Sequence, residues 1–586
     1  MSPLEGHESI PQYKGMTGRN CIEKVAFLRS VAAPKKHVLK CGDRKSRVEY
    51  SSSAILKAVM GGEGGTMTEK HVCVVGAGIG GLTSAMILAH RGFRVTVLEK
   101  EDGVGGRNRA IEFDGFSFDT GPTFLMMKFI LDDMFHEVDR RPEDYMELVR
   151  LEPMYQLIFD DFAMKFTTER GEMKRQLKEH FPGSEDGLDT FLEKEGKRFG
   201  YLFPCLQRPY SSWTSLFAPI FLRALPHLSL ASSVMDKVKS YFGSEELGIS
   251  FSFQSKYLGM SPWTCPAAFT MLSYIEHAYG IYHIQGGLKN ITASMAKVFE
   301  EEGGEIRLES PVARVLTDDE RATGVELEDG EQIMADEVVL NADFGYAADE
   351  LIASDHLRRW HPDKLRDKPF SCSTFMLYLG MDREYNLPHH NIIFAPDYRQ
   401  NLQDIFEDKR LSDDLSYYVR NASLTDPHLA PEGKSALYVL VPVPNNKSDI
   451  NWETEKPAFR DRVLDKMSEL DEMGDIRDHI EAEHIITPDD WENDYNVFLG
   501  ATFNLAHTVS QMMYFRPRNK FEELESCYLV GGGTHPGSGI PTILESGRIS
   551  ANLISEKYAV PYENPRSLEE LLGESYSPEQ VPELQT

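Results

Sequence analysis

The chain has 586 residues, more than one ordinary hydrophobic core organises, so we expect two or more lobes. Its hydrophobic fraction of 41% and aromatic fraction of 10% are typical of a folded protein. The formal net charge of −30 argues against a nucleic-acid partner, because no basic surface remains to neutralise phosphates. It does not exclude a membrane, since an apolar patch can dock on lipid without help from charge.

Residues 1–66 differ from the rest of the chain. They hold more basic than acidic side chains and end in a glycine-rich run at residues 61–65. We expect an untranslated or disordered extension rather than a targeting segment, because a transit peptide is poor in acidic residues. Residues 561–586 are acidic and contain proline, which predicts a disordered tail.

The seven cysteines, at positions 21, 41, 73, 205, 265, 372 and 527, form no CxxC pair and no regular spacing. This scattered, odd-numbered set argues against a disulfide framework and against a zinc site. We therefore expect buried free thiols in a reducing compartment, and no metal centre.

Residues 71–99 predict a complete strand–turn–helix–strand unit. The apolar run at 71–75 suits a strand buried on both faces of a parallel sheet. Apolar residues at helical spacing follow in residues 82–89, and a second strand is predicted at 94–98. The unit ends in the carboxylate of Glu99.

The residue types in the turn of this unit point to a dinucleotide. Gly76 permits the tight turn, Gly78 lets the backbone approach a pyrophosphate, and Gly81 lets helix and strand pack closely. The first helical N–H groups then face the phosphates, and Glu99 is placed to accept hydrogen bonds from a ribose. The alternative is a glycine-rich turn in an α/β fold that binds nothing.

Two further motifs follow Glu99, namely residues 105–107 (Gly-Gly-Arg) and residues 119–123 (Asp-Thr-Gly-Pro-Thr). This arrangement resembles the superfamily of flavoprotein amine oxidases and carotenoid desaturases, in which the double glycine and the arginine continue the contact with the cofactor. The resemblance implies that the dinucleotide is FAD and that Lys100, Gly106 and Arg107 contribute to its site.

Residues 124–279 mix helical patterns with loops and are predicted to form a helical cap, a membrane-facing substrate lobe. The stretch at 213–235 is strongly apolar, but Pro219, Arg223, Pro226 and His227 interrupt it, and the chain has no run of 18 apolar residues for a transmembrane span. This pattern suits a segment in the membrane interface or at the mouth of an apolar channel. A cap helix buried in protein is the alternative.

Residues 280–345 return to the first lobe, with a helix over 288–298, strands near 305–308, 312–315, 322–327 and 335–343, and a hairpin turn at Asp329 and Gly330. Together with 67–123 and 500–560 they are predicted to form a discontinuous nucleotide-binding domain. Residues 346–499 contain alternating strands at 373–379 and 436–441, which predict a sheet that walls off a pocket. The pair His389 and His390 could be ligands or bases, but without a partner motif we interpret it as structural.

The glycine-dense loop at residues 531–541 follows a predicted strand at 527–530 and precedes a helix starting near Thr542. Such a loop offers backbone N–H groups to an anion or a flavin. Residue by residue, it closely resembles the C-terminal signature of bacterial-type phytoene desaturases, and so do residues 119–123, 426–433 and 514–517. The resemblance covers about residues 70–560.

This resemblance implies an α/β fold: a discontinuous Rossmann-type FAD-binding domain with an inserted α+β substrate domain and a helical cap. The cofactor-binding residues would be Gly76, Gly78, Gly81, Glu99, Lys100, Gly106, Arg107, Val312, Gly532, Gly533, Gly539 and Ile540. We expect both glycine-rich loops to converge on one flavin, with an apolar tunnel beside it.

The implied function is an FAD-dependent carotenoid desaturase that introduces double bonds into phytoene, towards lycopene, by hydride transfer to the flavin. Such an enzyme must hold a hydrocarbon chain and exclude water, so it needs neither a nucleophilic triad nor a metal. His535 is the candidate proton acceptor and Arg223 a candidate positioning group. A quinone or dioxygen would reoxidise the flavin, and the protein would be cytoplasmic and peripherally attached to the membrane that dissolves its isoprenoid substrate.

Three alternatives remain open: a carotene cis–trans isomerase, a desaturase of C30 or hydroxylated carotenoids, and a non-enzymatic prenyl-lipid-binding protein of the Rab GDP-dissociation-inhibitor kind. The intact set of Gly76, Gly78, Gly81, Glu99 and Arg107 argues against the last.

Overall fold

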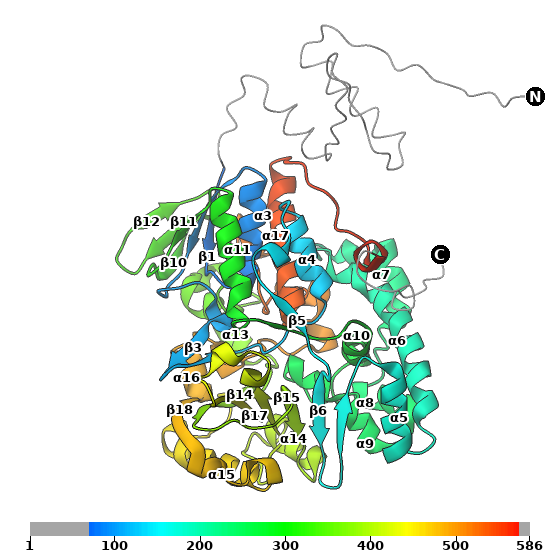
Figure 1. Cartoon of the computed structure of the whole chain (residues 1–586). Helices are drawn as coiled ribbons and strands as arrows, with labels where there is room; N and C mark the ends of the chain where they lie inside the picture. The colour runs from blue at the N-terminus through cyan, green and yellow to red at the C-terminus, as the bar shows by residue number, and fades with distance from the viewer. Residues whose placement is uncertain (1–69, 574–586) are drawn as a thin grey trace, which may run out of the picture. The chain divides into compact units, whose positions relative to one another are not determined.

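The structure, a computed structural model, describes residues 70–573, so the extension predicted for residues 1–66 lies outside the described residues. A five-stranded parallel sheet forms the centre of the first lobe (Figure 1), with the strand order β19-β13-β1-β2-β9. The strands are Cys527–Leu529, Glu337–Leu340, His71–Val75, Arg94–Leu98 and Glu305–Arg307. Segments from both ends and the middle of the chain thus share one sheet, and the strands predicted at 71–75 and 94–98 are confirmed.

Helices cover this sheet where the sequence predicted them. Helix α3 (Ile79–His90) follows β1 directly and is buried along almost its whole length, because α11 (Lys289–Glu301) and α17 (Ile540–Lys557) pack on it. Figure 1 shows these helices side by side with α4 (Lys128–His136). A three-stranded meander of β10 (Val312–Asp318), β11 (Arg321–Leu327) and β12 (Gln332–Met334) lies beside them, and its last two strands are joined by the predicted turn at Asp329 and Gly330.

The second lobe is built on a seven-stranded sheet with the order β18-β14-β17-β16-β15-β6-β7. Its strands are Ile480–Ile486, Ser373–Met381, Ser435–Val443, Tyr417–Asn421, His390–Ile393, Tyr155–Ile158 and Ala163–Phe166. The last two come from the segment 124–279, for which we predicted only a helical cap. They join the sheet because β6 pairs in parallel with β15, more than 200 residues further along the chain.

Side chains alternate between the two faces of this sheet. Odd-numbered residues such as Phe375, Leu377 and Val439 form one core with helix α15 (Trp452–Ser468). Even-numbered residues such as Met376 and Tyr438 project from the opposite face. The sheet therefore has one face covered by α15, whereas the opposite face is partly covered by side chains such as Phe116 and Trp491 and also lines a cavity.

The remaining elements surround these two sheets. Two small antiparallel pairs are β3–β4 (Ala110–Phe113 and Phe116–Asp119) and β5–β8 (Leu148–Arg150 and Tyr282–Ile284). The helical cap comprises α5 (Arg170–His180), α6 (Glu185–Leu206), α7 (Pro219–Ala224), α8 (Val234–Phe242), α9 (Glu245–Ser250) and α10 (Met271–Tyr279). Short helices elsewhere are α12 (Phe344–Tyr346), α13 (Pro362–Arg366), α14 (Tyr398–Phe406) and α16 (Pro488–Asn493).

The tail is ordered further than we predicted. We expected residues 561–586 to be disordered, but α18 (Leu568–Gly573) buries Leu568, Leu571 and Leu572 in the main core. The prediction of disorder from the acidic composition was wrong for α18, because these three leucines bury enough apolar surface to order the segment.

A buried cluster of charges joins α17 to α4. The Arg548 guanidinium contacts the carboxylates of Asp133 and Glu545, and it lies 3.6 Å from Glu137. Asp133 also pairs with Arg566 at 2.7 Å, just before α18. Arg548 is 1% exposed, so removing it would leave the buried Glu545 carboxylate without its cation and would take one of two cations from Asp133.

We predict that Arg548→Met lowers the free energy of unfolding by about 3–5 kcal/mol, the usual cost of breaking a buried ion pair. The matched control is Arg175→Met, which removes an exposed arginine that also pairs with two carboxylates, Glu172 and Glu179. That change should cost less than about 1 kcal/mol. Urea denaturation measures both values, and equal losses would contradict the structural role given to the buried cluster.

Candidate active site

One cavity of about 520 Å³ is lined by both glycine-rich loops and by the seven-stranded sheet. Gly76 and Gly78 line it from the loop before α3, and Gly80 lines it from the first turn of that helix. Residues 531–533 and 538–541 line it from the loop before α17 and the first turn of α17. The first turn of α3 touches the second loop, because a Cβ atom built on Gly80 would lie 3.0 Å from the backbone nitrogen of Gly531. The predicted convergence of the two loops is therefore present in the structure.

Both helix N-termini at this cavity suit an anionic ligand. Helix α3 begins after Gly78 and α17 begins after Gly539, and neither helix has a side-chain cap on its first N–H groups. Gly539 adopts a φ of +118°, which side chains with a Cβ rarely tolerate. Uncapped N–H groups together with the helix dipole favour phosphate groups at this end of the cavity.

The glycines at the start of α3 also make room for a protein side chain. A Cβ on Gly78 would lie 2.8 Å from Nδ2 of Asn341, and one on Gly80 would lie 2.8 Å from Oδ1 of the same residue. Asn341 follows strand β13 and donates from Nδ2 to the Gly76 carbonyl at 3.2 Å. Asn341 was not among the predicted site residues, because the strand predicted at 335–343 ran past it; β13 ends at Leu340, so Asn341 lies at the carboxyl end of the strand, where ligands of such sheets bind.

The predicted acid is held rigidly at the end of β2. Glu99 accepts hydrogen bonds from the Ala77 N–H to Oε2 at 2.8 Å and from the Glu101 N–H to Oε1 at 3.1 Å. The side chain is buried, yet it lines the cavity. Both carboxylate oxygens keep lone pairs for ribose hydroxyls.

Most of the predicted cofactor-binding residues line this cavity: Gly76, Gly78, Glu99, Lys100, Gly106, Arg107, Val312, Gly532, Gly533, Gly539 and Ile540. Gly81 does not line it, but a Cβ there would lie 2.2 Å from the Gly76 carbonyl oxygen, as its predicted packing role requires. Asn108 Oδ1 and Thr502 Oγ1 are buried in the cavity wall without a hydrogen-bond partner among the described residues. Buried polar atoms without partners fit a site completed by a polar cofactor such as FAD.

The other half of the cavity is apolar and aromatic. Two cross-strand rows of the sheet face it: Met376, Leu440, Tyr418 and Ile392 form one, and Tyr438 and His390 belong to the next. Phe124, Met126, Phe253 and Tyr257 line it as well. The sheet predicted to wall off a pocket does so with its even-numbered face.

Residues 119–123 join this sheet to the nucleotide end of the cavity. Tyr378 donates its hydroxyl to the Thr120 carbonyl at 2.6 Å, and Tyr438 donates to the Gly121 carbonyl at 2.8 Å. Tyr418 donates to Thr123 Oγ1 at 3.0 Å. Arg420 pairs with Asp119 at 2.6 Å, and both side chains are 2% exposed. We name this set of contacts the tyrosine seam.

His535 does not stand where a catalytic base would be needed. Its ring is not part of the cavity wall; Nε2 donates to the Cys205 carbonyl at 3.2 Å, and the ring packs edge-on against Tyr210. Burial lowers the pKa of His535 to about 3, which keeps the ring neutral. The loop does reach the cavity, but it turns this side chain towards the helical cap, so we do not retain His535 as the proton acceptor.

Arg223 also lies outside the cavity wall, and its side chain is exposed on α7. Five large apolar side chains around it are 42% to 64% exposed, namely Trp213, Phe217, Leu222, Leu225 and Leu230. We name this group the apolar cap surface. The alternative of a cap helix buried in protein is therefore wrong for these five residues.

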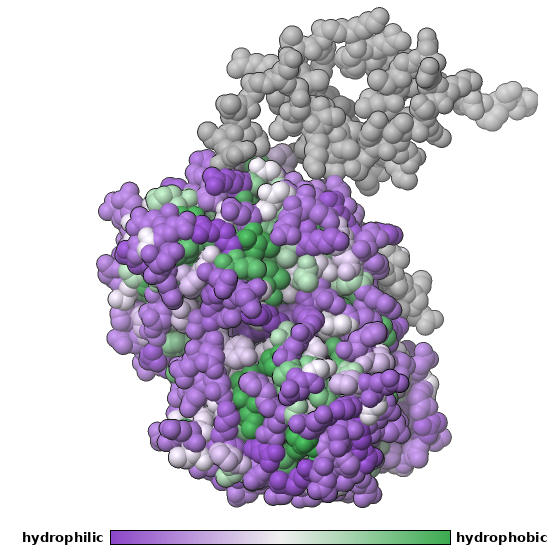
Figure 2. All heavy atoms as spheres, turned by 60° about the vertical axis from the view of Figure 1, so that its left-hand side comes forward, coloured by the Kyte–Doolittle hydropathy of each residue, from purple (hydrophilic) through white to green (hydrophobic). Residues whose placement is uncertain are grey.

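One face of the molecule is mainly polar (Figure 2). Figure 2 shows a face covered mostly by hydrophilic residues, with hydrophobic ones gathered in its middle, as the net charge of −30 leads one to expect. No helix among residues 70–573 is both long and apolar enough to cross a bilayer.

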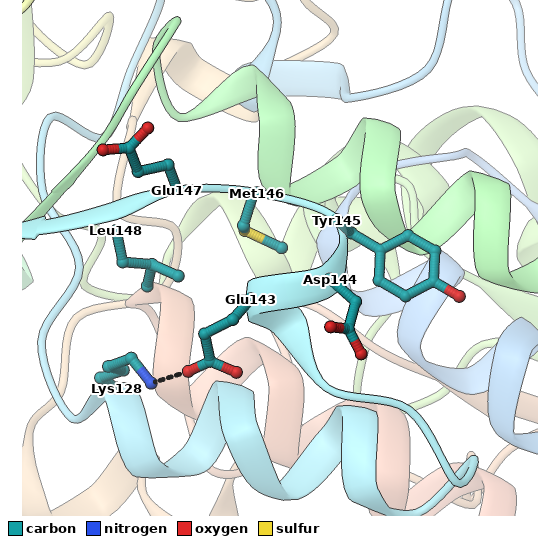
Figure 3. Close-up of a pocket in the computed structure, with 7 residues that line it drawn as sticks. All are labelled: Lys128, Glu143, Asp144, Tyr145, Met146, Glu147 and Leu148. Carbon is teal, nitrogen blue, oxygen red and sulfur yellow. Dashed lines mark hydrogen bonds and ion pairs between the residues drawn. The ribbon is translucent and has the colours of Figure 1, made fainter.

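A second hollow, of about 610 Å³, lies between α4 and residues 143–148 (Figure 3). Its Lys128 amine is neutralised by Asp132 at 2.7 Å and by Glu143 at 2.8 Å. It contains none of the predicted site residues, so we assign the chemistry to the first cavity.

We predict that Gly81→Ala abolishes flavin binding, because its Cβ would collide with the Gly76 carbonyl and separate α3 from the nucleotide loop. Gly171→Ala is the matched control, since a Cβ there meets nothing within 4 Å. The flavin absorbance per mole of purified protein measures the result. A Gly81→Ala protein that remains fully yellow would disprove the packing role of this glycine.

Comparison with known proteins agrees with this geometry. A family model described as flavin containing amine oxidoreductase matches residues 79–555. The chain is 52% identical over 495 residues to a 4,4'-diapophytoene desaturase (4,4'-diapolycopene-forming) of Methylomonas sp., covering 84% of this chain and 97% of that protein. It is 38% identical to a zeta-carotene-forming phytoene desaturase of Myxococcus xanthus, covering 83% and 93%.

Solved structures share the fold. A putrescine oxidase aligns with a TM-score of 0.53 at 14% identity, covering 84% of this chain and 99% of that one. An oxidoreductase from Methanosarcina mazei aligns with a TM-score of 0.55 at 17% identity, covering 83% and 100%. These likenesses bear out the predicted Rossmann-type fold, and the family fixes FAD as the cofactor. The chain belongs to the flavin-containing amine oxidoreductase family, in its branch of carotenoid desaturases, and is an FAD-dependent oxidoreductase acting on CH–CH bonds.

Proposed function

We propose that this carotenoid desaturase acts on 4,4'-diapophytoene, a C30 hydrocarbon, and converts it stepwise towards 4,4'-diapolycopene. The support for this substrate is the 52% identity, over nearly the full length, to a protein of that name. The sequence motifs favoured phytoene, with a C30 substrate as an alternative. The observation that carries the proposal is the cavity whose nucleotide half opens directly into an apolar half.

The chain's own residues have limited chemical tasks in this reaction. The apolar wall holds an extended hydrocarbon and excludes water, and the tyrosine seam fixes that wall relative to the nucleotide loop. When bound, FAD supplies the hydride acceptor. Neighbouring double bonds of the substrate spread the developing positive charge, so the protein needs no nucleophile.

Phytoene, the C40 analogue, is the second candidate substrate. Two relatives of Myxococcus xanthus support it: the phytoene desaturase at 38% identity and an all-trans-zeta-carotene desaturase at 36%. Both hydrocarbons have the same apolar chemistry, so the length of the cavity decides between them.

We predict that the purified FAD-loaded protein, mixed with 4,4'-diapophytoene in liposomes and a quinone, gives products whose masses fall in steps of two hydrogens. Phytoene in parallel liposomes should react more slowly. Mass spectrometry of the extracted pigments measures both reactions, and samples without quinone, with and without dioxygen, identify the electron acceptor. Products of unchanged mass would instead indicate a cis–trans isomerase, and no change in either hydrocarbon would refute desaturation.

The apolar cap surface supports peripheral attachment to a membrane, from which the lipid-soluble substrate would enter. Its side chains belong to the segment at 213–235, where we predicted an interfacial segment. Trp213 and Phe217 are aromatic residues that suit the lipid–water interface, and Arg223 can extend its cation to the headgroups.

We predict that Trp213→Ser combined with Phe217→Ser lowers binding to phosphatidylcholine vesicles at least 10-fold, because each ring loses the apolar area it would bury in lipid. Met334→Ser is the matched control, since Met334 is 59% exposed on β12, in the first lobe. Co-sedimentation measures the bound fraction. Equal binding by the native and doubly substituted proteins would rule out this surface as the attachment site.

A further inference from the structure

One histidine in the cavity wall has a ring nitrogen that the described protein does not use. His390 lies on β15, is 1% exposed and lines the cavity together with Thr123, Phe124 and Tyr418. Its Nε2 has no hydrogen-bond partner among the described residues. A buried polar nitrogen without a partner is costly, so its presence at a substrate cavity points to a role in the reaction.

The hydrogen bonds on the other side of the ring fix which nitrogen carries the proton. His390 Nδ1 lies 2.6 Å from the Tyr418 hydroxyl oxygen. Because that hydroxyl donates its own hydrogen to Thr123 Oγ1 at 3.0 Å, Nδ1 must donate to Tyr418. In the neutral ring Nε2 is then unprotonated, and its lone pair can accept a proton.

The surroundings keep this ring neutral before the reaction. Burial, and after it the positive charge of Arg420, lower the pKa of His390 well below its ordinary value. Arg420 lies directly opposite His390 on β16 and is itself held by Asp119. Protonated His390 would therefore be a strong acid, so the ring can take a proton only from a donor that is stronger still.

We propose that His390 is the proton acceptor of the desaturation, with Nε2 removing the proton from the carbon next to the one that loses hydride. This inference rests on the proposed function. One C–H bond gives its hydrogen and both electrons to FAD. The second C–H bond breaks, its electron pair forms the new C=C bond, and its proton binds Nε2. The ring returns that proton to solvent before the next turnover.

A weak base is sufficient for this step. Loss of hydride leaves an allylic cation, whose neighbouring C–H bonds are far more acidic than an imidazolium. The ring needs only to be neutral and to offer a fixed lone pair, and the contact between Nδ1 and Tyr418 provides the second condition. Phe124 packs edge-on at 5.3 Å and holds the ring against the cavity.

The test compares His390→Phe with His277→Phe. His277 is also buried, also has an Nε2 without a partner among the described residues, and has a pKa that burial lowers to about 4, but it does not line the cavity. We expect His390→Phe to slow formation of the desaturated product from 4,4'-diapophytoene at least 100-fold in a single turnover. His277→Phe should stay within 3-fold of the native rate, and both variants should retain full FAD.

Two further measurements separate proton removal from a structural role. Deuterium at the carbon that loses the proton should slow His390→Phe more than it slows the native enzyme, because proton removal then limits the rate. Without turnover, the ammonium group of geranylgeranylamine should donate to Nε2, so that native protein binds this amine about 10-fold more tightly than the matched hydrocarbon. His390→Phe should lose that preference, and His277→Phe should keep it.

Failure of this inference differs from failure of the proposed function. If the native protein leaves both hydrocarbons unchanged in mass, the proposed function is wrong. If the native protein desaturates but His390→Phe keeps its rate within 10-fold, or keeps its preference for the amine, His390 is not the proton acceptor.

Discussion

The tyrosine seam is the constraint on which the active cavity depends. Three hydroxyls from three adjacent strands of the second lobe hold the backbone and side chain of residues 120–123, which continue from the nucleotide lobe. The buried pair of Arg420 and Asp119 locks the same junction, and Asp119 also accepts the Leu288 N–H at 2.7 Å, at the start of α11. A buried ion pair adds little net stability, but its fixed geometry sets how the sheet lies against the nucleotide loop.

Much of the nucleotide lobe could be predicted from the sequence because its signals are local. The apolar runs of β1 and β2, the glycines between them and Glu99 all lie within 30 residues, and each has its own physical reason. The seven-stranded sheet was predicted only in part. The alternating patterns of β14 and β17 predict strands. Strands β6 and β7 are short, and their place in the sheet depends on the pairing of β6 with distant β15 and of β7 with β6.

The site shows the same division between local and distant determinants. The backbone loops follow from glycine spacing, so eleven of the predicted cofactor residues line the cavity. Side-chain direction does not follow from spacing: the loop at 531–541 reaches the cavity, while the His535 ring turns to the Cys205 carbonyl, 330 residues away. No role for His390 could be predicted from the sequence, because its partners Tyr418 and Thr123 lie far from it in the chain and come close only in the folded sheet.

The even-numbered face of the second sheet would hold a hydrocarbon mainly by dispersion contacts of similar strength along its length. An apolar wall of this kind offers a saturated or polyene chain no preferred register, because sliding by one isoprene unit exchanges one dispersion contact for another. The position at which the end of the hydrocarbon stops in the cavity would then decide which carbon–carbon bond meets the flavin. Successive oxidations along one molecule would need only sliding of the hydrocarbon within the cavity, and changing the bulk of a wall residue at its end would alter how many double bonds accumulate.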